Sequence, residues 1–194
     1  MRIESERERW DRKYAAGEGP AHFKPKPFLT RHHQMLGGGR ALDVACGFGG
    51  NALYLASLGY RVDAVDASGF ALGKVKAEAA RRGLPVTLVQ ADLIRWWVPP
   101  ARYNLIVVFF YLNRALMPAL AAGLRPGGLL FQANRNARFL AVRPGFDPDY
   151  LLQPGELGRR ARAVGLEVVH DTDSTPGKRT GEDHDSQLIA RQPG

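Results

Sequence analysis

Three aspartates and a glycine-rich turn follow apolar stretches at places where polar side chains can meet. Asp43 lies in RALDVA, Gly47 and Gly49 come directly after it, Asp66 ends YRVDAVD, and Asp92 follows PVTLVQ. Glycines where a strand turns into a helix let a ligand approach backbone amides and the positive helix end. Carboxylates at neighbouring strand ends can accept hydrogen bonds from that ligand. The pattern therefore predicts a small-molecule site at one edge of a parallel sheet.

Asp43 indicates which ligand the glycine turn would accept. A carboxylate there repels a pyrophosphate, because two like charges a few Å apart in a partly desolvated crevice cost on the order of kcal/mol. A ligand that carries an ammonium and a sulfonium but no phosphate, such as S-adenosylmethionine, is attracted instead. The alternative is that Asp43 only caps the turn through its backbone amides. Gly47, Gly49 and Ala52 also fit the dinucleotide pattern GxGxxA, which does not choose between cofactors.

The other two aspartates favour an adenosine ligand. We expect Asp66 to accept both ribose hydroxyls, a role that nicotinamide and adenosylmethionine enzymes share. An N-cap of the following helix is the alternative, although Ser68 could do that equally well. We expect Asp92 to reach the adenine amino group and Leu93 to pack on the ring face.

These residues need a sheet to bring them together, and the apolar pattern supplies one. Short apolar runs (RALDVA, YRVDAVD, PVTLVQAD, YNLIVVFFY, GGLLFQAN) alternate with helical patterns, except that residues 93–102 are too short and proline-rich for a full helix. Strands without polar alternation indicate a parallel sheet covered on both faces. The final strands, LEVVHD and SQLIAR, are joined by a polar turn and predict a hairpin. We predict an α/β fold: a single-domain, doubly wound, Rossmann-like, mostly parallel sheet of about seven strands with a C-terminal antiparallel hairpin strand.

The chain length suits a single domain over residues 1–194. An N-terminal helix is expected over residues 4–16, where Trp10 and Tyr14 share one face and would dock the helix. Pro20, Pro25 and Pro27 predict an extended connection after it. The predicted parts are an N-terminal helix and flap (1–36), a cofactor-binding core (40–134), a lid loop (135–153), and a helix with the C-terminal hairpin (154–194).

Composition and charge narrow the classes of partner that the protein could bind. The net charge of +8 comes from 27 basic and 19 acidic residues, which makes a nucleic-acid partner possible. The basic residues are scattered, and the densest groups, Arg81 with Arg82 and Arg159 with Arg160 and Arg162, lie on predicted helix surfaces. We therefore favour an ordinary solvated basic surface over a nucleic-acid site.

Cysteine, histidine and hydropathy give further expectations. Cys46 is the single cysteine, which excludes an internal disulfide and a cysteine-based zinc site, and the five histidines lack ligand-like spacing. We predict no metal. No apolar run approaches ~20 residues, and the charged start MRIESERERWDRKY is unlike a signal peptide. The expectation is a cytoplasmic protein with no membrane partner.

Several motifs of the chain resemble those of a known enzyme family. The string LDVACGFGGNALYLASLGYRVDAVDAS resembles the first two motifs of class I S-adenosylmethionine-dependent methyltransferases, QADL resembles the third, and LRPGGLLF resembles the lead into the fifth strand. The resemblance runs from Trp10 to about Arg191. It is closest to the small branch related to tellurite-resistance and thiopurine-type methyltransferases, because of the N-terminal WDRKY helix and the PGEL helix after the long loop.

The resemblance implies methyl transfer from S-adenosylmethionine, with S-adenosylhomocysteine as product. The reaction is an in-line displacement, for which a protein chiefly positions and desolvates the reactants. The implied cofactor-binding residues are Asp43, Ala45, Cys46, Gly47, Gly49, Asn51, Asp66, Ala67, Asp92, Leu93 and Phe109.

The turn departs from the family pattern, which usually has three alternating glycines after the acidic residue. Here Ala45 takes the first glycine position and Cys46 precedes Gly47. We expect alanine to permit the turn if its φ is negative. Cys46 is either a small filler under the ligand, which we favour, or a reactive thiol.

Residues for the methyl acceptor are expected after the fourth strand, in FFYLNRALMP. The Asn-Pro-Pro-Tyr-type tetrad of amino methyltransferases that act on adenine or glutamine is absent, which disfavours those acceptors. Tyr111 is the candidate catalytic residue, as a hydrogen-bond partner or proton acceptor, although core packing explains it equally well. The substrate-rim candidates are Tyr111, Asn113, Arg114 and Arg135, with Arg138 beside them; the arginines would bind an anionic acceptor or are simply solvated.

We expect a small-molecule acceptor. The alternatives are an RNA or protein methyltransferase of the same fold, a nicotinamide-dependent oxidoreductase built on GFGGNA, and a methyltransferase-like binding module without activity. The sequence leaves the acceptor and the oligomeric state open.

Overall fold

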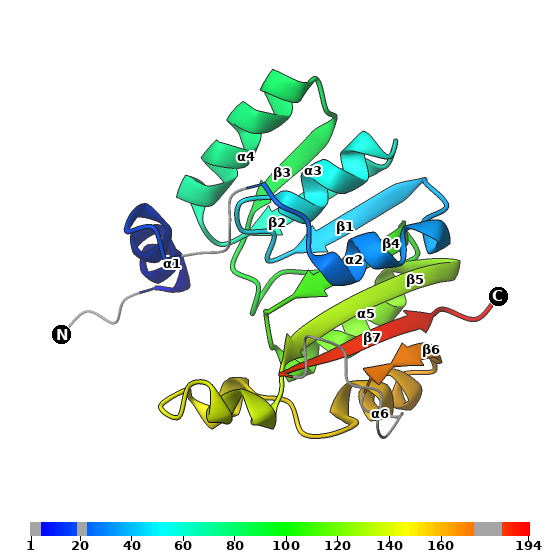
Figure 1. Ribbon diagram of the computed structural model, residues 1–194. Helices are drawn as coiled ribbons and strands as arrows, with labels where there is room; N and C mark the ends of the chain where they lie inside the picture. The colour runs from blue at the N-terminus through cyan, green and yellow to red at the C-terminus, as the bar shows by residue number, and fades with distance from the viewer. Residues whose placement is uncertain (1–4, 19–22, 173–183) are drawn as a thin grey trace. The chain divides into compact units, whose positions relative to one another are not determined.

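The computed structural model describes residues 5–18, 23–172 and 184–194 (Figure 1). It contains a seven-stranded mixed sheet whose strands alternate with helices, so the predicted α/β, Rossmann-like class is confirmed. Two compact units divide the chain, Met1–Trp97 and Val98–Gly194. The division into flap, core, lid and hairpin stays a prediction.

The first unit is built on three parallel strands. They are β1 (Arg40–Val44), β2 (Arg61–Asp66) and β3 (Val86–Gln90), paired in the order β3-β2-β1. Helix α3 (Gly50–Ser57) packs on β1 and β2, and α4 (Gly69–Arg82) packs on β2 and β3 (Figure 1). Ser68 caps α4 by accepting a hydrogen bond from the Ala71 amide at 3.1 Å. The ends of β1 and β2, near Asp43 and Asp66, therefore lead into the starts of α3 and α4.

The N-terminal part of this unit begins with α1 (Glu6–Ala15), which a reciprocal pair of hydrogen bonds between Ser5 and Glu8 caps. The Tyr14 ring packs edge-on against Phe48 with 4.9 Å between centroids, so the predicted docking by the aromatic face is confirmed. The predicted extended connection is wrong in part, because Pro27–Arg31 forms helix α2, followed by the 3-10 turn η1 (His33–Met35). Pro27 stands in the first turn of α2, where its missing N–H costs nothing.

The second unit pairs β4 (Tyr103–Phe109) in parallel with β5 (Leu124–Arg135). Strand β7 (Asp185–Arg191) is antiparallel to β5, and β6 (Glu167–Asp171) is antiparallel to β7, which gives the order β4-β5-β7-β6. The antiparallel C-terminal strand is thus confirmed. The predicted polar turn before it falls mostly within residues 173–183, outside the described residues.

Short helices complete this unit. Between β4 and β5 lie η2 (Arg114–Leu116) and α5 (Met117–Gly123), and α5 packs on β5. The long loop after β5 contains η3 (Ala137–Ala141) and η4 (Pro148–Tyr150), and α6 (Glu156–Ala163) packs on β6 and β7. Residues 91–102, all described, form neither helix nor strand, as the prolines predicted.

Candidate functional site

The turn from β1 into α3 has left-handed backbone at alternate positions. The φ values are +56° at Ala45, +53° at Gly47 and +70° at Gly49. Glycine adopts such values freely, whereas alanine in this region costs about 1 kcal/mol or more. The condition expected for Ala45, a negative φ, is therefore wrong. The turn therefore holds an alanine in a conformation that favours glycine.

Asp66 fixes this turn from the end of β2. Its Oδ2 accepts a hydrogen bond from the Gly47 amide at 2.8 Å, and its Oδ1 accepts one from the Ser68 amide at 2.9 Å. The side chain is only 4% exposed, and burial raises the pKa of its carboxyl although these amides act to lower it. Both oxygens are thereby held in one orientation at the strand end.

Asp43 lies beneath the same turn and is 1% exposed. Its Oδ2 accepts a hydrogen bond from the Ala52 amide at 3.0 Å in the first turn of α3. This bond favours the capping role that the sequence left open; contact with a ligand stays a prediction. Burial raises the pKa of Asp43 to about 8, since it outweighs the hydrogen bond from Ala52.

The start of α3 is also in contact with the N-terminal segment. Asn51 Oδ1 accepts a hydrogen bond from the Lys26 amide at 2.9 Å. Gly50 lies against the Lys24 carbonyl so closely that a Cβ at this position has no room. The predicted ligand-binding residue Asn51 is therefore part of the attachment of this segment.

Cys46 is buried in the turn. Its Sγ contacts the Gly47 carbonyl oxygen at 3.7 Å. Burial, followed by the charges of Asp43 and Asp66, raises the pKa of the Cys46 thiol well above its ordinary value. The thiol is thus kept neutral, which supports the filler role over the reactive one.

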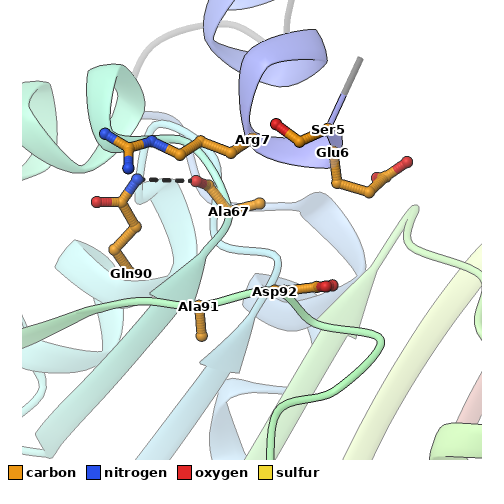
Figure 2. Close-up of a pocket in the computed structure, with 7 residues that line it drawn as sticks. All are labelled: Ser5, Glu6, Arg7, Ala67, Gln90, Ala91 and Asp92. Atoms are coloured by element: carbon orange, nitrogen blue, oxygen red, sulfur yellow. Dashed lines mark hydrogen bonds between the residues drawn. The ribbon is translucent and has the colours of Figure 1, made fainter. Parts of the chain in front are cut away.

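A pocket of about 310 Å³ lies where β2 and β3 end (Figure 2). Its lining consists of Ser5, Glu6, Arg7, Ala67, Gln90, Ala91 and Asp92. The Gln90 side chain donates to the Ala67 carbonyl at 3.1 Å, and Asp92 Oδ1 accepts from the Ile94 amide at 3.0 Å. An exposed carboxylate beside two alanines suits the amino group and flat apolar face of an adenine. The residues present therefore fit an adenosine ligand.

The structure brings some of the predicted cofactor residues to this pocket and leaves others away from its lining. Ala67 and Asp92 line it. Asp66 precedes Ala67 and accepts a hydrogen bond from the Ser68 amide, whereas Leu93 is buried. Asp43, Cys46 and Asn51 are not part of the lining. The pocket and the glycine turn are joined through the hydrogen bonds of Asp66.

Sequence reasoning missed the N-terminal helix as part of this site. Ser5, Glu6 and Arg7 line the pocket, and Asp11 Oδ1 accepts hydrogen bonds from Ser68 Oγ at 2.5 Å and from the Phe70 amide at 3.0 Å. A charged surface helix usually carries such residues on a solvated face, so their types gave no signal.

In the second unit the rim candidate Arg135 already has partners. Its guanidinium lies between the Phe110 and Phe139 rings, 4.8 Å and 4.6 Å from their centroids. Its Nη1 also pairs with Asp185 Oδ1 at 2.6 Å. Of the two alternatives for Arg135, simple solvation is therefore disfavoured, and binding of an anionic acceptor stays a prediction.

Arg114 is likewise engaged. It donates to the carbonyls of Asp149 and Leu151 at 2.7 Å and 2.8 Å, and its Nε pairs with Glu156 Oε1 at 2.7 Å. Burial acts to raise the pKa of Glu156, but hydrogen bonds from Arg114, the Gln153 amide and Arg160 lower it to about 2. Arg114 thus fastens the loop after β5 to α6 instead of being solvated.

The remaining residues of this region lie around the end of β4. Phe109 is buried, Phe110 is 38% exposed with a φ of +57°, and Asn113 caps η2 by accepting from the Ala115 amide at 3.0 Å. In the amide orientation that satisfies its bonds, the Asn134 oxygen accepts from the Tyr111 amide at 3.3 Å. The backbone that carries Tyr111 is therefore held in place; its catalytic role stays a prediction.

The described residues, 5–18, 23–172 and 184–194, contain no group of three or more His, Cys, Asp or Glu side chains that could hold a metal ion. Within the same ranges no helix combines the length and apolar character needed to cross a bilayer.

Comparison with known proteins identifies the family. A family profile described as a methyltransferase domain matches residues 41–128. The ubiquinone biosynthesis O-methyltransferase of Burkholderia vietnamiensis is 30% identical over 178 residues, which span 77% of this chain and 76% of that enzyme. Hemagglutinin 1 of Eikenella corrodens is 36% identical over 175 residues, 79% of this chain but only 57% of that protein. The chain thus spans little more than half of that relative.

Solved structures agree in fold. The structure described as "Conversion of a Disulfide Bond into a Thioacetal Group during Echinomycin Biosynthesis" matches with a TM-score of 0.74 at 21% identity, over 96% of this chain and 91% of that one. A SAM-dependent methyltransferase from Aquifex aeolicus matches with a TM-score of 0.69 at 16% identity, over 94% and 98%. With the matched domain and the ubiquinone relative, these findings show that the chain belongs to the class I S-adenosylmethionine-dependent methyltransferases.

Proposed function

We propose that the enzyme methylates a small planar aromatic molecule on a hydroxyl or thiol group. The observation that carries this proposal is the exposed ring of Phe110 at the end of β4, stacked through Arg135 on Phe139. A flat face of this kind favours a flat partner. Phe110 also has a left-handed backbone, and such strain in a non-glycine residue is concentrated at functional sites.

The relatives support the same class. One of them is named as an O-methyltransferase of ubiquinone biosynthesis, which points to an oxygen acceptor. We place the chain in the small branch related to tellurite-resistance and thiopurine-type methyltransferases, since the WDRKY and PGEL segments both form helices, α1 and α6, within the described chain. That branch adds sulfur as an alternative acceptor atom.

The first unit supplies the cofactor contacts in this proposal. Bound S-adenosylmethionine supplies an electrophilic methyl group. Asp66 accepts hydrogen bonds from the ribose hydroxyls, and Asp92 accepts one from the adenine amino group. Ala67 gives the adenine ring an apolar surface. The left-handed turn at Gly47 and Gly49 lets backbone come close to the ligand.

The paired arginines argue against RNA or protein as acceptor. Arg81 and Arg82 both bond Glu78, at 2.7 Å and 2.6 Å, and Arg160 bonds Glu156 at 2.9 Å. One carboxylate in each of the two densest basic groups therefore offsets part of the positive charge. An anionic small molecule is disfavoured for the same reason, because Arg114 and Arg135 are each paired with a carboxylate.

Two measurements test the proposal. Calorimetry should show S-adenosylhomocysteine binding, and a labelled-methyl assay should show transfer to phenols or aryl thiols but not to tellurite, aliphatic carboxylates or RNA oligonucleotides. Tyr111→Phe should lower kcat about 100-fold with KM little changed if the phenol accepts a proton. Transfer to RNA in preference to every small molecule would overturn the acceptor class, and an active Tyr111→Phe enzyme would remove Tyr111 from catalysis.

A further inference from the structure

Helix α1 forms one wall of the adenosine pocket. Its first turn and the preceding Ser5 line the pocket opposite Gln90 and Asp92, as Figure 2 shows. The helix is fastened beside the pocket by an apolar contact, in which Tyr14 packs on Phe48 and Ala71. Phe48 stands between the two glycines of the turn. A ligand enclosed by this wall therefore meets α1 when it enters or leaves.

A polar contact reinforces the apolar one and leads into the site. Asp11 Oδ1 accepts from Ser68 Oγ and from the Phe70 amide, and the Ser68 amide in turn donates to Asp66. Asp66 then accepts from the Gly47 amide. A continuous series of hydrogen bonds thus joins α1 to the Asp66 carboxylate, the proposed ribose acceptor, and to the glycine turn. The other oxygen of Asp11 lies 3.8 Å from the Nε of Arg7 in the pocket wall.

Helix α1 is so short that its stability depends on this contact. A helix of 10 residues is shorter than the roughly 12 to 15 residues at which an isolated helix becomes even marginally stable in water. Its helical form therefore depends on being docked, so that undocking also unfolds the wall of the pocket. Hydrogen bonds to a charged acceptor are the stronger kind, which gives Asp11 a large share in this balance.

We propose that Asp11 is a positioning residue that fastens α1 over the adenosine pocket and thereby limits how fast the cofactor and its product exchange. This inference rests on the cofactor site proposed above. Asp11 touches neither reactant; it acts through Ser68 on Asp66 and through Arg7 on the pocket wall. Bound ligand and docked α1 then stabilise each other.

The test uses the full chain, S-adenosylhomocysteine as the probe and Asp11→Asn as the variant, which keeps the shape but removes the charge. Displacement in a stopped-flow instrument gives the dissociation rate, and hydrogen exchange reports on residues 6–15. We expect Asp11→Asn to dissociate the probe about 5 to 20 times faster and to lose the protection that the probe gives α1. The matched control is Glu78→Gln, which removes a carboxylate from α4 away from α1 and should stay within about twofold of the wild type.

A double-variant cycle separates positioning from simple packing. If Asp11 acts through Ser68, the effect of Asp11→Asn on the dissociation rate should largely disappear in a Ser68→Ala background. An unchanged dissociation rate in Asp11→Asn, with α1 exchanging faster, would overturn the inference while leaving the cofactor site intact. Failure of the wild-type chain to bind the probe would instead refute the proposed site.

Discussion

The strand ends of the two units hold charged side chains in opposite ways. In the first unit the carboxylate of Asp66 accepts hydrogen bonds from the backbone amides of Gly47 and Ser68. In the second unit the charged groups are Arg114 and Arg135, and they pair with Glu156 and Asp185. The charged group of the first unit is thus bound by backbone amides, whereas the charged groups of the second unit are bound in ion pairs.

This difference indicates that one unit binds the ligand and that the other stabilises its own loop. A carboxylate has about four acceptor positions, so an aspartate that takes two backbone amides can still accept from a ligand. A guanidinium is used up more completely, as Arg114 shows by giving its donors to two carbonyls and one carboxylate. We infer that the first unit presents the charge of Asp66 to a ligand, whereas in the second unit Arg114 uses its charge to hold a loop.

The largest effect on binding should come from Asp66→Ala. It removes the proposed ribose acceptor and releases the amides of Gly47 and Ser68, so S-adenosylhomocysteine should bind at least 10-fold more weakly, equivalent to ~1.5–3 kcal/mol. Calorimetry measures the affinity, and circular dichroism checks the fold. An unchanged affinity in a folded variant would show that the first unit does not offer this charge to the ligand.

The corresponding change in the second unit is Glu156→Gln, which should lower stability by about 2 kcal/mol at pH 7 without changing cofactor affinity. The pKa of Glu156 is about 2 in the folded chain against an ordinary 4.5, so its contribution is present above pH 4.5 and is lost as the pH falls toward 2. Denaturant titration of both proteins should show their difference shrinking over that range. A constant difference would mean that packing, and not charge, is responsible.

Asp43 should show the reverse pH dependence. Its pKa is about 8 in the folded chain against an ordinary 3.8, so folding favours its protonated form. That advantage is complete below pH 3.8 and is lost as the pH rises toward 8. Relative to Asp43→Asn, which does not titrate, the wild type should therefore lose about 1.4 kcal/mol of stability for each pH unit between about pH 4 and pH 8. Parallel stability curves for the two proteins would contradict the burial argument.

The smallest effect is expected from Ala45→Gly. It relieves a left-handed alanine but adds freedom to the unfolded chain, and since αL strain costs about 1 kcal/mol or more, a net gain of about 0.5–1 kcal/mol should result. Thermal unfolding measures this gain, with Gly49→Ala as the opposite control because a Cβ there would strike Val75. A less stable Ala45→Gly would show that the alanine packs well enough to outweigh its strain.

Much of the fold could be predicted from the chain itself. Apolar runs without polar alternation predicted the parallel strands, and Ser68 marked the start of α4. Pro27 misled, because the same ring that excludes proline from a helix interior suits a first turn. The conformation of Ala45 was also missed, because a side chain's identity does not show the strain that its neighbours impose.

The site was predictable only where its residues follow strands. Asp66 is the last residue of β2, Ala67 follows it, and Asp92 lies two residues after the end of β3. The neighbouring strands β2 and β3 bring these residues together. Asp11 and Arg7 lie far away in sequence and reach the same place through the docking of a helix, which no local pattern reports. The arginines of the second unit were misjudged for a related reason, since their partners Glu156 and Asp185 are distant along the chain.

Two helix glycines show how unevenly the chain tolerates change. Gly50, pressed against the Lys24 carbonyl, leaves no space for any side chain, whereas a Cβ on Gly73 of α4 would meet nothing within 4 Å. In a saturation-mutagenesis library, position 50 should therefore be depleted of nearly every substitution, while alanine at position 73 should be enriched because it gains up to ~1 kcal/mol of helix propensity. The contact at Gly50 also means that residues 24–26 cannot be treated as a dispensable leader when truncated forms of the enzyme are made.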